Sequence, residues 1–138
     1  MASFRKFNAF VADLANQVHD LSSDQITVAL TAAADAPVAA NAVLADLTEI
    51  DYTNLSTRDV TTVSSTQSGG LYKLVLTDLV LTASGGPVAT FRYIVLYNST
   101  VGAGPLIGFF DYGSNVALAD GDTFTIDFSA TNGVLTLQ

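Results

Sequence analysis

The side chains best suited to acid–base chemistry are the only histidine, His19, and the aspartate that follows it, Asp20. Any Ser-His-Asp relay would have to be built around this histidine. Because no G-x-S-x-G turn marks a nucleophile, a surface or capping histidine fits the pattern better than a catalytic one. A small hydrolase that uses His19 and nearby acids stays as one hypothesis, and it predicts that His19→Ala loses activity.

Ligands for metals and cofactors are scarce. Cysteine is absent and histidine occurs once, so we expect no zinc site, disulfide or thiolate nucleophile. Glu49 is the only glutamate, which weakens a glycosidase interpretation without ending it, because aspartate pairs can do the same work. Four aspartates near the C-terminus could hold calcium, although the lack of an EF-hand pattern favours turns with local hydrogen bonds: Asp111, Asp120, Asp122 and Asp127. We predict no catalytic residue, no cofactor and no metal.

Two other patterns could bind ligands. The segment VGAGPLIGFF, residues 101–110, contains G-x-G, but Pro105 and an apolar run follow it instead of a helix, so we interpret it as a loop between strands. Aromatic side chains on the neighbouring runs could stack on sugars or simply fill a core, and both interpretations stay open: Tyr93, Tyr97, Phe109, Phe110 and Tyr112.

One cation stands inside an apolar run, FRYIVLYNST at 91–100. Strand alternation predicts one face with Phe91, Tyr93, Val95 and Tyr97 and another with Arg92, Ile94, Leu96 and Asn98. Arg92 could extend into solvent from an edge strand, pair with Asp78 or Asp111, or lie at a subunit interface.

The elements that would position these residues are predominantly strands. Seven β-branched or aromatic runs follow residue 58, and an eighth, QITVAL, occupies 25–30. Glycine-containing turns at 83–87, 119–123 and 129–134 predict that the last forty residues are hairpin-connected strands. A spacing near ten residues favours an all-β fold, an antiparallel β-sandwich of about eight strands, jelly-roll or immunoglobulin-like.

The first half of the chain is less regular. Apolar residues at three- and four-residue steps between Phe7 and Leu21 predict a helix, so residues 1–24 are interpreted as a short N-terminal helix or arm. Residues 31–57 are rich in alanine and contain Pro37, which predicts a long ordered connection that runs over the sandwich or reaches a neighbour. The whole chain, 1–138, is predicted to form one domain.

Composition excludes several classes of partner. Thirteen acidic and five basic residues give a formal net charge of −8, which would repel a nucleic acid. No apolar stretch is long enough to cross a bilayer, and the N-terminus lacks the apolar block of a secretory signal. We therefore predict no nucleic-acid or membrane partner and a protein that folds where it is made.

Several segments resemble small virion structural proteins of tailed bacteriophages. The resemblance is carried by FRYIVLYNST at 91–100, PLIGFFDYGS at 105–114, DGDTFTIDFS at 120–129 and NGVLTL at 132–137. The family pattern has an aromatic-Arg-Tyr-Ala/Ile-Val-Leu-Tyr-Asn strand, a Leu-Ile-Gly strand with Asp-Tyr-Gly, and a closing strand after glycine. The N-terminal segment FVADLANQVHDLSSDQITVALT, residues 10–31, is similar to the opening of these proteins. The match is densest over 70–138 and weakest over 31–57.

The resemblance implies a non-enzymatic capsid decoration (cement) protein made in the host cytoplasm and placed on the outer surface of the virion. Its implied partners are the major capsid protein and its own copies, as a homotrimer. On this hypothesis we place the contacts at Phe4, Arg5, Phe7, Phe10, Arg58 and Arg92. The alternative is a carbohydrate- or receptor-binding module of a phage tail or head fibre.

Overall fold

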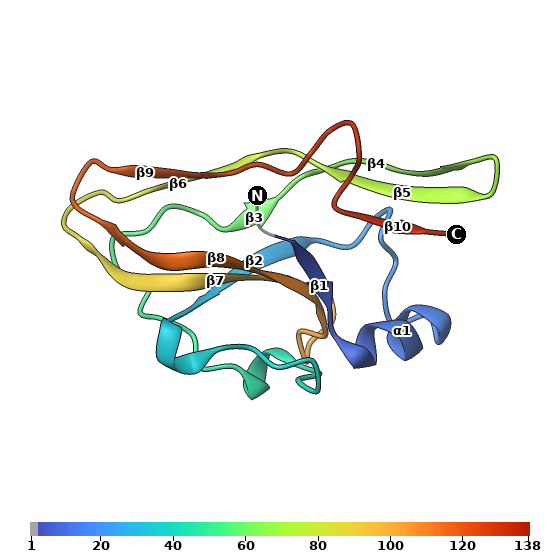
Figure 1. The fold of residues 1–138 in the computed structure, drawn as a ribbon, viewed down its shortest axis with the longest axis horizontal. Coiled ribbons are helices and arrows are strands. Elements are labelled where there is room, and N and C mark those ends of the chain that lie inside the picture. Colours follow the sequence, from blue (N-terminus) through green and yellow to red (C-terminus); the bar gives the residue numbers. More distant parts are fainter. Residues whose placement is uncertain (1–2) are drawn as a thin grey trace.

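The short β-branched and aromatic runs form strands in two antiparallel layers that pack face to face (Figure 1). The computed structural model describes residues 3–138. The first layer is a five-stranded sheet in the order β1 (Phe4–Lys6), β8 (Leu106–Leu118), β7 (Val88–Asn98), β2 (Ile26–Thr31) and β3 (Asp59–Val60). The second layer contains a three-stranded sheet, β10 (Leu135–Leu137), β5 (Leu71–Leu76) and β4 (Thr62–Ser68), and a ribbon, β6 (Leu79–Thr82) with β9 (Thr123–Ile126). The predicted all-β antiparallel sandwich is confirmed.

Each of the eight predicted runs contains a strand. The run at 60–63 is divided between β3 in the first layer and β4 in the second, so the chain changes layers there. β1 was not predicted, and it pairs with β8 in the register Phe4↔Phe110. Met1 and Ala2 of the predicted N-terminal arm lie outside the described residues.

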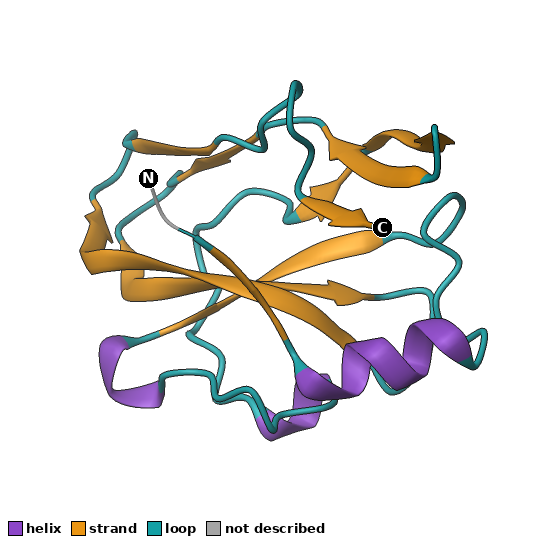
Figure 2. Ribbon diagram, turned by 45° about the vertical axis from the view of Figure 1, so that its right-hand side comes forward, coloured by secondary structure: helices purple, strands orange, loops and turns teal. Residues whose placement is uncertain are grey.

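Two hydrophobic clusters lie on opposite faces of the five-stranded sheet. The larger joins side chains of both layers, among them Leu30, Leu74 and Leu96, which are all fully buried. The smaller lies on the other face and is closed by Leu44 and Leu47 of the long connection. That connection, predicted at 31–57, runs over the sandwich and carries 3-10 turns at Ala33–Asp35 and Leu44–Asp46 (Figure 2).

The N-terminal helix α1 (Asn8–Ala15) confirms the predicted helix but ends before the last apolar residues of the predicted stripe. Phe10 is its buried residue, and Gln17 follows the helix with a left-handed φ of 64°. Within residues 3–138, no helix is both long and apolar enough to cross a lipid bilayer.

The alternation predicted along β7 is interrupted between Phe91 and Tyr93. Phe91 pairs with Val116 but Tyr93 pairs with Asp111, so β8 has additional residues opposite this point. Phe91 consequently belongs to the larger cluster with Leu96, whereas Tyr93 packs against the smaller one. The predicted common face of Phe91 and Tyr93 is wrong, because an irregular register shifts one part of the strand relative to the other.

The three predicted tight turns form, but none of them joins two strands that pair with each other. The turns at 83–87 and 119–123 carry the chain between layers, because β7 pairs with β8 and β6 with β9. The predicted series of hairpins in the last forty residues is therefore wrong. A two-residue hairpin instead lies at Gly69 and Gly70, whose φ values of 61° and 85° suit a tight turn between β4 and β5.

Candidate functional site

The N-terminal segment proposed for contacts is largely part of the chain's own fold. Phe7 is 0% exposed and packs on Phe109, with their ring centroids 5.1 Å apart. Phe10 is 3% exposed and lies 5.2 Å from the ring of His19. Phe4 is half-buried against Phe110, and only Arg5 of the four is exposed. Burying one Phe side chain contributes about 1.5–3 kcal/mol, so Phe7 and Phe10 stabilise the fold and are not surface residues.

Arg92 pairs with an aspartate of the same chain. Its Nε and Nη2 donate to the two carboxylate oxygens of Asp111, at 2.8 and 3.1 Å. Oδ1 of Asp111 also accepts from the amide of Gly113 at 2.8 Å, inside the irregular part of β8. The hydrogen bonds from Arg92 and then from Gly113 lower the pKa of Asp111. Of the interpretations left open for Arg92, pairing with Asp111 is confirmed, and the ion pair joins β7 to β8 where their register is irregular.

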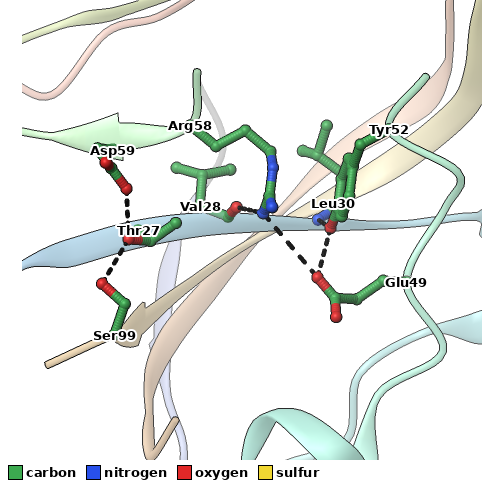
Figure 3. Close-up of polar contacts among 8 residues, drawn as sticks. All are labelled: Thr27, Val28, Leu30, Glu49, Tyr52, Arg58, Asp59 and Ser99. Carbon is green, nitrogen blue, oxygen red and sulfur yellow. Dashed lines mark hydrogen bonds and ion pairs between the residues drawn. The ribbon is translucent and has the colours of Figure 1, made fainter. Parts of the chain in front are cut away.

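Arg58 contacts three groups of its own chain at the edge of β2 (Figure 3). Its guanidinium lies 3.6 Å from the centroid of the Tyr52 ring, donates to the carbonyl of Val28, and has Nη1 3.9 Å from Oε1 of Glu49. The Tyr52 hydroxyl accepts from the amide of Leu30 at 2.9 Å and donates to Glu49 at 2.6 Å. These side chains satisfy β2 backbone groups beyond the short strand β3, and so protect an open edge.

Burial and the hydrogen bond to Glu49 raise the pKa of Tyr52. The phenol therefore stays protonated at any physiological pH and keeps its donor role toward Glu49. Nothing in the sequence pointed to this group, because Glu49, Tyr52 and Arg58 share no periodicity and meet only when the connection folds along β2.

His19 is buried, not at the surface, with 6% exposure. The oxygen of the Asn98 amide accepts from the backbone of Thr100 at 3.0 Å, which leaves its nitrogen facing Asp24 at 2.6 Å and Nδ1 of His19 at 3.2 Å. Because an amide nitrogen can only donate, Nδ1 accepts and the imidazole proton resides on Nε2. Burial lowers the pKa of His19, and this outweighs the carboxylates of Asp13 and Asp24, which raise it.

The candidate metal and sugar residues do not converge. The described residues, 3–138, contain no group of three metal-ligating side chains. Asp122 accepts from the amide of Ala119, which is the local hydrogen bond predicted for a turn, whereas Asp120 accepts from the amide of Gly85 in a different turn. Among the aromatics, Tyr97 and Phe109 are buried in the smaller cluster while Tyr112 is 50% exposed, so the residues do not form one stacking face.

An open pocket of about 600 Å³ lies between the segment that follows α1 and the β4–β5 hairpin. His19 and Asp20 line it on one side, and Tyr72 and Ser65 line it on the other. The hydroxyl groups of Tyr72 and Ser65 are 2.7 Å apart, and burial raises the pKa of Tyr72. Sequence reasoning found the His19–Asp20 pair but not the hairpin residues, because β5 is more than fifty positions away.

The β4–β5 hairpin extends beyond the end of the first layer (Figure 1). β4 is the last strand of its sheet. Residues 60–77 contain none of the thirteen acidic residues and a single charge, Lys73. In a chain with a net charge of −8, β4 is therefore an uncharged edge strand, the kind of edge to which another strand can be added.

The chain matches no family model, no curated protein and no solved structure.

Proposed function

We propose that this chain is a non-enzymatic virion structural protein, a capsid decoration protein that binds the major capsid protein lattice and its own copies on the outer surface of the head. The sequence resemblance over residues 70–138 motivates the proposal. The observation that carries it is the uncharged free edge of β4, because a protein whose role is adhesion needs a surface that other chains can approach.

The distribution of acidic residues favours the β4 edge as the contact surface. None of the thirteen acidic residues lies within residues 60–77, whereas contacts at acid-rich parts of the surface would bring carboxylates of two copies together. Pairing along β4 avoids that repulsion. Burial across subunit boundaries would then stabilise the assembled lattice, because binding to the assembled form shifts the equilibrium toward it.

A single substitution tests the proposal without disturbing the fold. Thr66 is exposed on β4 and stands directly opposite Lys73 on β5. Thr66→Glu therefore places a favourable cross-strand charge pair inside the hairpin while adding a negative charge to its edge. We expect purified wild-type protein to bind expanded heads that lack it, and the Thr66→Glu variant to reach clearly lower occupancy.

Thr123→Glu, on the exposed end of β9, is the matched control and should bind as the wild type does. Truncation of the N-terminal segment is a poor test, because Phe7 and Phe10 are buried in the fold. Failure of the wild type to bind such heads would reject the decoration role. Equal occupancy of the three proteins would reject β4 as the contact.

A further inference from the structure

The pocket between the segment after α1 and the β4–β5 hairpin has features that the decoration role does not use. It has a volume of about 600 Å³, within the range of about 300–1,000 Å³ that is usual for small-molecule sites. Its walls come from three separate parts of the chain, residues 14–22, the hairpin and β10. The hollow is thus built by tertiary structure and not by one loop.

The lining combines flat or apolar groups with hydroxyl, amide and carboxylate groups. Tyr72 and Leu137 supply the apolar part, and Leu137 is 41% exposed although it is apolar. Gln17, Asp20 and Ser22 supply the polar part, and all three are exposed. Tyrosine is suited to such a site because its ring offers a flat apolar surface and its hydroxyl offers a hydrogen bond.

The lining contains one carboxylate, that of Asp20, and neither lysine nor arginine. Asp20 is held in place, since its Oδ1 accepts from the Ser22 amide at 3.0 Å and its own amide donates to Asp24 at 2.8 Å. A fixed carboxylate without a compensating cation repels phosphates, sulfates and acidic sugars. It can accept hydrogen bonds from neutral hydroxyl groups.

Two conformational details occur in the same lining. Gln17 has a φ of 64°, a left-handed conformation that a residue with a long side chain seldom adopts. His19 carries its proton on Nε2, because its Nδ1 faces the amide nitrogen of Asn98, and this buried Nε2 has no partner among the described residues. The wall of the pocket therefore includes a strained residue and a hydrogen-bond donor without an acceptor.

We propose that this pocket binds a neutral saccharide, with Tyr72 against the sugar ring and Asp20, Gln17 and Ser22 bonded to its hydroxyl groups. The unpartnered Nε2 of His19 has almost no exposed surface, so a sugar in this pocket lies beside the imidazole without bonding to that nitrogen. The pocket includes Ser65 of β4 and Tyr72 of β5, so it adjoins the edge proposed for lattice contacts, and sugar binding is therefore tested on the free protein.

The test is a titration of the free protein, without heads, followed by amide NMR shifts. The probes are neutral hexoses and their short oligomers, with oligomers of uronic acids as the charged comparison. We expect saturable shifts confined to residues 17–22, 72 and 137 with a neutral probe, a shift of the His19 Nε2 signal, and no response to uronic acids.

Substitutions then locate the site. Asp20→Asn, at an exposed position, should weaken binding at least tenfold, and Tyr72→Phe should retain most of it because the ring remains. Tyr112→Ala, which removes an exposed tyrosine elsewhere, should bind as the wild type does. No saturable shift with any neutral probe, equal binding by Asp20→Asn, or preference for uronic acids would overturn the proposal. None of these outcomes bears on attachment to heads.

Discussion

At the edge of β2, side chains replace the neighbouring strand that the backbone lacks. β3 pairs only with Ile26 and Thr27, yet Leu30 is fully buried and its amide needs an acceptor. The Tyr52 hydroxyl provides that acceptor at 2.9 Å and donates its own hydrogen bond to Glu49 at 2.6 Å. Arg58 lies over the Tyr52 ring and makes a cation–π contact with it. A small set of residues thus closes an edge that would otherwise be open.

Tyr52→Phe is expected to lower the free energy of unfolding by about 1–3 kcal/mol, because it leaves the buried Leu30 amide without an acceptor. Chemical denaturation of both proteins measures the difference. Tyr112→Phe is the matched control, since Tyr112 is 50% exposed, and its effect should stay within about 0.5 kcal/mol. Equal stability of the Tyr52→Phe variant and the wild type would contradict the assigned role of the hydroxyl.

Among the elements, β1 depends on the close approach of two backbones. A side chain at Gly108 would overlap the ring of Phe4, and its Cβ would lie 2.8 Å from the carbonyl oxygen of Arg5. The glycine therefore permits β1 to lie against β8, and β1 in turn leads into Phe7 and α1.

Gly108→Ala is expected to move β1 away from β8 and to cost about 1–3 kcal/mol, the usual range for overpacking. The amide of Phe7, which donates to the carbonyl of Ile107 at 3.1 Å, should exchange with solvent faster. Gly102→Ala is the control, because nothing lies within 4 Å of a side chain placed there. Unchanged exchange at Phe7 in the Gly108→Ala variant would contradict this account.

The elements also show what the sequence could and could not predict. Strands such as β2 and β5 were predictable, because their residue types and boundaries are local properties. Pairing was not, since a dipeptide such as Asp120-Gly121 specifies a reversal without specifying which sheet receives the next strand. β1 was missed because three residues, Phe4–Lys6, carry too little pattern and are held by the glycine opposite them.

The residues of the candidate site also include some that the sequence could predict and others that it could not. His19 and Asp20 are adjacent in the sequence, and pairing of Arg92 with Asp78 or Asp111 is one of the alternatives that the sequence predicts. Tyr72 could not be placed beside His19 from the sequence, because their proximity depends on how the hairpin folds over the segment after α1. Long-range contacts of this kind are a property of the tertiary fold and leave no local periodicity.

For the whole molecule, the proposed association makes a prediction about salt. Copies with a net charge of −8 repel one another, whereas the β4–β5 hairpin carries only Lys73. Raising ionic strength from about 0.01 to 0.15 M shortens the Debye length from about 30 to 8 Å, which screens the repulsion and leaves an uncharged strand contact intact. Sedimentation velocity of the free protein should therefore show more oligomer at the higher salt concentration, and Thr66→Glu should show less than the wild type at both. Dissociation by salt would mean that the copies meet through ion pairs, and the contact would have to be sought near Arg5 or Lys6 instead of β4.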